Sequence, residues 1–263
     1  MTVTSISPED PEPSREEGIW LKLMRGSLSL PYAKVDRTSY LRNQLIPYFD
    51  DRTVMEAIAT RPAQAGIRPE AIDKLADASI RHHTLAASGA SFFAGIPGGF
   101  ALAATIPTDL LQLQWNAIQL AQKLAYLYGW PDLLENGEVD EETELQITLL
   151  FGAMMGSAAA VRGLREVARR FSLEVIRRLP RQALTKTAYY PIAKQVGKWI
   201  GISVTKRGFA VGVAKAVPLV GGVVSAGLTL ATIRPMGKKL KGHLRELRFA
   251  YPDDVADNKA VEG

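Results

Sequence analysis

The chain of 263 residues is long enough to bury a core, and its 47% hydrophobic and 22% charged residues match neither a disordered chain nor a protein with many membrane spans. It contains no cysteine, which excludes disulfide bonds, thiolate metal ligands and thiol catalysis. Its start is acidic, with Glu9, Asp10 and Glu12, whereas a signal peptide begins with basic residues and an apolar run. We therefore expect a cytoplasmic protein that lies, at most, peripherally on the inner face of the cell membrane.

The net charge of +5 hides a strong asymmetry along the chain. Residues 1–155 carry 12 Lys and Arg against 20 Asp and Glu, residues 156–250 carry 19 against 3, and residues 251–263 carry 1 against 4. The basic block from 156 to 250 indicates an anionic partner or surface. The alternative is that the acidic N-terminal half packs against this block and cancels its field.

Three helices are expected in the first third of the chain. Apolar residues recur at helical spacing from about residue 15 to residue 25. Asp51 is a candidate N-cap for a short helix that ends near Gly66, and Pro69 opens a longer one. The apolar stripe of this longer helix consists of Ile72, Ala76, Ile80, His83 and Ala87.

Two apolar stretches are each interrupted by a glycine pair. No charged residue occurs from Thr84 to Thr108, and Pro97 precedes Gly98–Gly99 in its middle, which leaves two arms of roughly 18 Å that are too short to cross a bilayer. The stretch Ala216–Ile233 repeats this pattern. We expect two Gly-rich apolar helical hairpins, which either form buried core or dip into a membrane.

A central helix is expected from Thr108 to Tyr128, because apolar residues cover most of its girth. The sequence Gly129-Trp130-Pro131 should end it, with glycine just past the last helical turn. A following helix contains Gly152 and Gly156, whose spacing is typical of close helix packing. The polar positions of the central helix form one narrow stripe, namely Gln112, Asn116, Gln119 and Lys123.

Cationic side chains line two expected helices in the basic block, at 162–181 and 234–248, and the first of them keeps an apolar face. Both segments are consistent with helices that lie on an anionic surface, although the solvated outer face of an ordinary bundle would show the same pattern. The candidate surface-binding residues are Arg162, Arg165, Arg169, Arg170, Arg177, Arg178, Lys238, Lys239, Lys241, Arg245 and Arg248.

Only one weak catalytic pair can be suggested. His83 lies on an apolar stripe, where a histidine of the core is the plain interpretation and proton transfer with Asp109 is the alternative. Asp109 either faces the positive end of its helix or lies buried, where desolvation would raise its pKa. No nucleotide-binding, metal-protease or hydrolase motif occurs, so we expect no metal and no cofactor, and no nucleic-acid-binding motif accompanies the basic block.

Several runs of the sequence together resemble the EcsC protein family. They are GIPGGFALAATIPTDLLQLQ, AQKLAYLYGWPDL, LLFGAMMGSAAA and AVPLVGGVVSAGL, and the resemblance covers about Trp20 to Arg248. Its most specific pieces contain Pro107, Asp109 and Leu110, and the run from Leu124 to Trp130. The resemblance implies a bacterial protein, associated with a transporter operon and cytoplasmic or membrane-associated, without an assigned reaction or cofactor.

The sequence thus predicts an all-α fold with a single multi-helix domain over residues 14–250, between disordered tails at 1–13 and 251–263. The leading hypothesis is a non-enzymatic accessory protein, related to transport or secretion, that associates peripherally with anionic lipid. One alternative is an enzyme with a buried site at Asp109 and His83. The other is a soluble scaffold that binds an acidic protein partner through the same basic surface.

Overall fold

The computed structural model describes residues 13–86, 108–134, 139–177, 189–215 and 221–247. Within these ranges every regular element is an α-helix, which confirms the all-α, single-domain prediction. The two terminal tails and the Gly-rich stretch at 87–107 lie outside the described residues. The helices are α1 (Arg15–Leu28), α2 (Arg37–Leu45), α3 (Asp51–Ala59), α4 (Pro69–Ala86), α6 (Thr108–Leu127), α7 (Glu141–Met155), α8 (Ala158–Arg177), α9 (Tyr190–Lys215) and α10 (Gly221–Arg245).

Local capping chemistry sets several of these boundaries. The carboxylate of Asp50 accepts hydrogen bonds from the backbone N–H and the hydroxyl of Thr53, so α3 is capped one residue earlier than expected and Asp51 is its first helical residue. The prediction for the end of α6 is confirmed. Gly129 adopts a φ of +87°, and the N–H of Trp130 donates to the carbonyl of Ala125.

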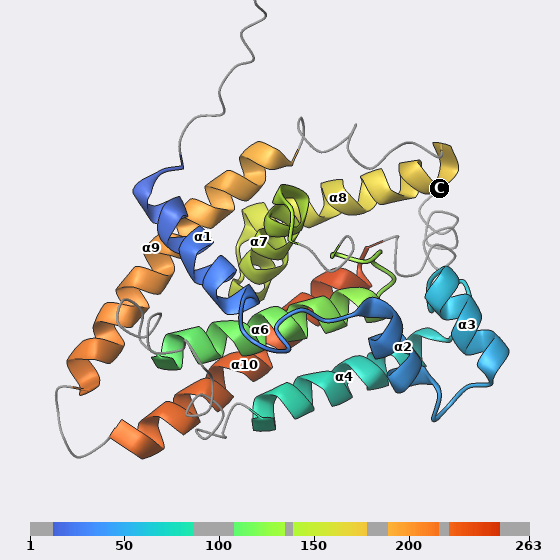
Figure 1. Cartoon of the computed structure of the whole chain (residues 1–263), viewed down its shortest axis with the longest axis horizontal. Coiled ribbons are helices and arrows are strands. Elements are labelled where there is room, and N and C mark those ends of the chain that lie inside the picture. Colours follow the sequence, from blue (N-terminus) through green and yellow to red (C-terminus); the bar gives the residue numbers. More distant parts are fainter. Residues whose placement is uncertain (1–12, 87–107, 135–138, 178–188, 216–220, 248–263) are drawn as a thin grey trace, which may run out of the picture.

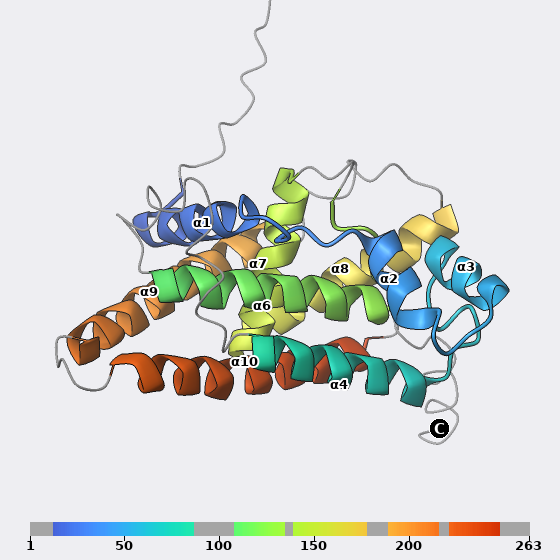
Figure 2. The same ribbon diagram turned by 60° about the horizontal axis from the view of Figure 1, so that its bottom comes forward.

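The helix α6 occupies the middle of the molecule. Figure 2 shows it between α1 on one side and α4 and α10 on the other. Two amides of its polar stripe, Asn116 and Gln119, are buried along with its apolar side chains, and Lys123 is half-buried. Its amide side chains therefore need partners, and Gln122 donates to the carbonyl of Ala33 and accepts from the N–H of Val35. Through these bonds α6 holds the connection between α1 and α2.

Glycines mark the places where helices approach most closely. A Cβ built on Gly201 of α9 would lie 1.9 Å from the carbonyl oxygen of Glu16 in α1, and one built on Gly152 of α7 would lie 2.5 Å from Val196 Cγ1 in α9. The expected close packing at Gly152 is thus found. Gly156, with a φ of +94°, instead ends α7 in a left-handed conformation.

The second Gly-rich stretch differs from the expected hairpin of two short arms. The helix α10 begins at Gly221 and continues past Pro235 to Arg245, so residues 221–233 form a single arm. Pro235 is an exposed residue of this helix. A hairpin within 216–233 is therefore not seen in the described part of this stretch.

One buried guanidinium joins three helix ends. Arg37, at the start of α2, is only 8% exposed. Its nitrogens donate to the carbonyls of Ile58 and Thr60 at the end of α3, at 2.6 and 3.0 Å, and to the carbonyl of Trp130 just past α6, at 3.0 Å. These carbonyls have no helical partner of their own, so Arg37 satisfies groups that would otherwise be buried without a hydrogen bond.

The contact at Gly201 can be tested by adding one methyl group. We expect Gly201→Ala to lower the free energy of unfolding by roughly 1–3 kcal/mol, because the new Cβ would overlap backbone atoms of α1. Gly242→Ala is the matched control. Nothing lies within 4 Å of its Cβ position on α10, so alanine should stabilise that helix by roughly 0.5–1 kcal/mol. Urea unfolding measures both, and equal effects of the two variants would contradict this packing.

Candidate functional site

The acidic half of the chain neutralises part of α10. Lys241 Nζ lies 2.9 Å from Asp77 Oδ1, and Arg245 Nε lies 3.3 Å from Asp73 Oδ2, with both carboxylates on α4. Asp73 also accepts a hydrogen bond of 2.6 Å from the hydroxyl of Tyr128. Two of the predicted surface-binding cations are therefore engaged in the fold, in the way that the alternative of internal compensation requires.

Two further cations of the basic block pair with its own carboxylates. Arg169 forms a two-pronged contact with Glu166 one turn earlier on α8. Arg165 lies 4.0 Å from Glu246 of α10. Both pairs are at the surface, where such contacts contribute about 0–1 kcal/mol, and they use up the two carboxylates whose side chains are described in this block.

Five other cations in the described part of the basic block are left uncancelled by carboxylates. All five are exposed, and none forms an ion pair with a carboxylate of the described part of the chain: Arg162, Lys198, Arg234, Lys238 and Lys239. Of these, Lys198 and Arg234 were not among the candidates from the sequence. Four remaining candidates cannot be placed: the side chains of Arg170 and Arg177 are not described, and Arg178 and Arg248 lie outside the described residues.

The helices α9 and α10 converge at one end of the molecule. Figures 1 and 2 both show the C-terminal end of α9 beside the N-terminal end of α10, far from α2 and α3. From Lys206 to Ile233 the sequence contains no acidic residue. In the described ranges no helix is both long and apolar enough to cross a membrane.

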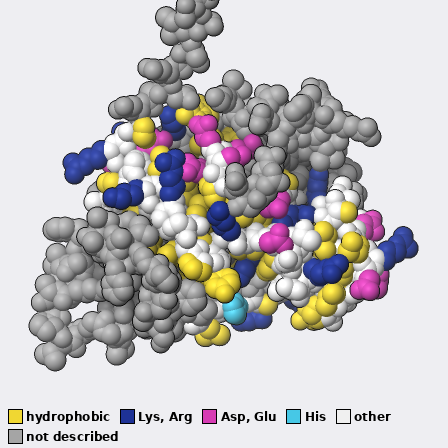
Figure 3. Space-filling model, in the orientation of Figure 1, with side chains coloured by type: hydrophobic (Ala, Val, Ile, Leu, Met, Phe, Trp, Pro, Cys, Tyr) yellow, Lys and Arg dark blue, Asp and Glu magenta, His cyan; other side chains and the backbone are white. Residues whose placement is uncertain are grey.

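The face of the molecule seen in Figure 3 is not uniformly basic. On the face in Figure 3, Lys and Arg side chains alternate with Asp and Glu side chains. On α10, Arg234 and Lys238 are four residues apart and therefore lie on one face of the helix. Lys198 is exposed on α9. Exposed cations are thus carried by both of the helices that converge at this end of the molecule.

His83 belongs to a buried polar cluster between α4 and α6. It is 3% exposed, with its Nδ1 2.5 Å from Asn116 Oδ1 and its Nε2 2.9 Å from Lys123 Nζ. Because Asn116 also donates its amide to the carbonyl of His83, its oxygen is the atom that faces the ring. Nδ1 therefore carries the proton and Nε2 accepts from the lysine. Lys123 also lies over the ring of Tyr40, whose hydroxyl is 2.9 Å from Ser79 Oγ.

Burial controls the protonation of this cluster. Desolvation, followed by the charge of Lys123, lowers the pKa of His83 to about 3, although the hydrogen bond with Asn116 acts in the opposite direction. Burial also lowers the pKa of Lys123. The ring of His83 is thus neutral at physiological pH, and both of its nitrogens already have partners. The Asp109 side chain is not described, so its pairing with His83 stays a prediction from the sequence.

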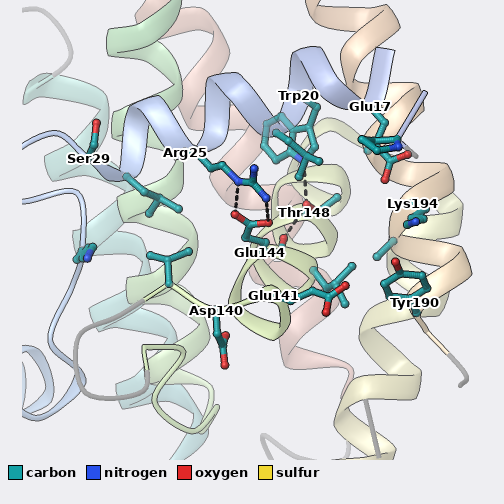
Figure 4. A pocket seen from close by; sticks show the side chains of 18 residues that line it. Glu17, Trp20, Arg25, Ser29, Asp140, Glu141, Glu144, Thr148, Tyr190 and Lys194 are labelled. Atoms are coloured by element: carbon teal, nitrogen blue, oxygen red, sulfur yellow. Dashed lines mark hydrogen bonds and ion pairs between the residues drawn. The ribbon is translucent and has the colours of Figure 1, made fainter. Parts of the chain in front are cut away.

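An open groove of about 820 Å³ lies between α1, α7 and α9 (Figure 4). Inside it, Arg25 and Glu144 form a two-pronged ion pair at 2.5 and 2.8 Å, and this pairing raises the pKa of Arg25. Trp20 Nε1 donates to Thr148 Oγ1 at 2.8 Å across its floor. These contacts join α1 to α7, so the polar groups at the centre of the groove serve to hold its walls together.

In the ranges that the structure describes, no group of three His, Asp or Glu side chains could hold a metal ion. No protein-family model, curated protein or solved structure matches the chain.

The neutral His83 should make stability depend on pH. Below pH 6.5 the unfolded chain binds a proton at this residue, and the native protein does not until about pH 3. The free energy of unfolding should therefore fall as the pH is lowered through this window, by up to about 1.4 kcal/mol per pH unit from this group. Chemical unfolding at several pH values in this window measures the free energy of unfolding. Its slope against pH should be shallower for His83→Gln than for the wild type.

His82 provides the control, because it is the neighbouring histidine and its side chain is exposed. We expect His82→Gln to keep the wild-type slope, which also contains the contribution of the carboxylates. A wild-type slope in His83→Gln would contradict a buried, neutral His83.

Proposed function

We propose that this protein is a non-enzymatic accessory protein that attaches peripherally to anionic membrane surfaces through its C-terminal helices. The observation that carries the proposal is the sorting of the basic block into neutralised and uncancelled cations. Lys241 and Arg245 are paired with α4, whereas Arg234 and Lys238 on the same helix are exposed and form no ion pair with a described carboxylate. Positive charges that are not neutralised in the folded protein produce an electric field that can act on a partner.

The binding free energy expected from these cations suits reversible attachment. A basic residue close to an anionic leaflet contributes about 1 kcal/mol, so the five uncancelled cations of α8, α9 and α10 suffice for peripheral binding if several reach the surface together. This attraction is screened over a Debye length of about 8–10 Å at physiological salt. The proposed contact is therefore close, and high salt should weaken it.

The proposal extends to location and family. Anionic lipids give the cytoplasmic leaflet its negative potential, so we place the protein on the inner face of the cell membrane. Membership of the EcsC family and a role beside a transporter or in secretion form part of the same proposal, as does the apolar hairpin expected within 84–108. Nothing in the geometry around His83 favours the alternative of an enzyme, because its ring nitrogens are occupied by Asn116 and Lys123.

Charge reversal at two positions tests the proposal. Arg234→Glu with Lys238→Glu should reduce co-sedimentation with phosphatidylcholine–phosphatidylglycerol vesicles at least roughly tenfold, since two attractive charges become repulsive. The matched control is Arg42→Glu with Arg52→Glu, which changes the net charge equally at exposed positions of α2 and α3. The control should bind like the wild type.

Two outcomes would overturn the proposal. One is equal binding of the wild type to neutral and to anionic vesicles, and the other is an equal loss of binding in both double variants. If the basic surface instead binds an acidic protein, that protein should stay bound after a detergent wash, and the chain should not sediment with protein-free vesicles.

A further inference from the structure

The outer edge of α9 exposes an aromatic and an aliphatic side chain next to a lysine. Trp199 is 39% exposed and Ile202 is 37% exposed, and they are three positions apart along the helix, so they are neighbours on one face. Lys198 beside them is also exposed. Tryptophan is usually buried in a water-soluble domain, so a surface position next to an aliphatic side chain requires an explanation.

Packing on the opposite side of α9 fixes the direction of this edge. Gly201 lies against the backbone of α1, and Gly197 lies against Trp20 and Thr148. Val196 and Ile200 contact the position of Gly152 in α7. Because backbone and side chains are in contact on this inner face, α9 cannot rotate about its axis to bury Trp199 without losing its contacts with α1 and α7.

Charge distinguishes this edge from the exposed apolar residues near α3. Tyr48 and Met55, near α3, are more exposed than Trp199, but Asp50, Asp51 and Glu56 are exposed beside them. The sequence of α9 contains no acidic residue over its whole length. The edge of α9 therefore combines exposed apolar side chains with the charge that an anionic leaflet attracts.

The side chains suit the boundary between lipid headgroups and acyl chains. Tryptophan is enriched at that depth because its ring is apolar while its N–H can meet water or headgroups. A lysine can lay its stem along apolar surface and keep its ammonium among the headgroups. The helix has 26 residues, about 39 Å, but it is not apolar enough to cross a hydrocarbon core of about 30 Å. Lying along the surface is thus the orientation that brings this edge to lipid.

We propose that α9 lies flat on the membrane and inserts Trp199 and Ile202 into the interface, with Lys198 at the headgroups. This inference rests on the proposed attachment to anionic membranes and goes beyond it in one respect. Electrostatic attachment alone is reversed by salt, whereas inserted apolar side chains should retain part of the protein at high salt.

Quenching by brominated lipid tests the insertion directly. Wild-type protein bound to anionic vesicles should lose tryptophan fluorescence when the acyl chains carry bromine. Trp20 and Trp130 are fully buried and Trp115 is half-buried, so most of this loss should come from Trp199. The variant Trp199→Phe should sediment with the same vesicles and lose most of the quenching. Equal quenching of this variant, or no quenching of the bound wild type, would overturn the insertion while leaving the attachment in place.

A salt wash provides the second measurement. Trp199→Ala with Ile202→Ala should reduce the fraction that stays on anionic vesicles at high salt roughly tenfold. The matched control, Tyr48→Ala with Met55→Ala, removes two exposed apolar side chains near α3 and should behave like the wild type. Equal retention of the two double variants would contradict insertion through α9. If the wild type fails to sediment at low salt, both the attachment and the insertion are wrong.

Discussion

The close contact between α1 and α9 is the constraint on which the rest of the structure depends. The backbone of Glu16 occupies the space that a side chain at residue 201 would need, and only glycine has none. A similar contact occurs at Gly237 of α10, where a Cβ would lie 2.9 Å from Ile80 and 3.0 Å from Leu120. With these helices held so closely, α6 is enclosed and the outward edge of α9 is determined.

Electrostatics then divides the basic block into two parts. The register of α10 against α4 brings Lys241 and Arg245 to the carboxylates of Asp77 and Asp73. One to two turns earlier on the same helix, Arg234 and Lys238 have no such partner in the described part of the chain. Folding therefore cancels the charge in the last turns of α10 and leaves it uncancelled on the turns just before them, near the middle of the helix.

The features that could be predicted from the sequence are the local ones. The central helix and its end at Gly129 follow from apolar periodicity and from a capping pattern of a few residues. The pairing of Asp73 with Arg245 could not be predicted, because it depends on the packing of helices that are far apart in the chain.

In the candidate site, too, the local features could be predicted from the sequence and the contacts between distant helices could not. The cationic segments follow from composition, but the cluster of His83, Asn116 and Lys123 depends on the register of α4 against α6. The exposed edge at Trp199 could not be predicted from the sequence. Glycines line the buried face of α9, so that face is not recognisable as an apolar stripe. Small residues mark a helix interface as surely as large ones, but a hydrophobic pattern does not detect them.

The guanidinium of Arg37 makes two distant parts of the chain depend on each other. Since it serves carbonyls after α3 and after α6 at once, fraying of the last turn of α6 deprives the α2–α3 pair of its closing contact, and the reverse also holds. The short helices α2 and α3 would be marginal in isolation. Through one side chain they become part of the cooperative unit that contains the central helix, and they should share its resistance to local opening.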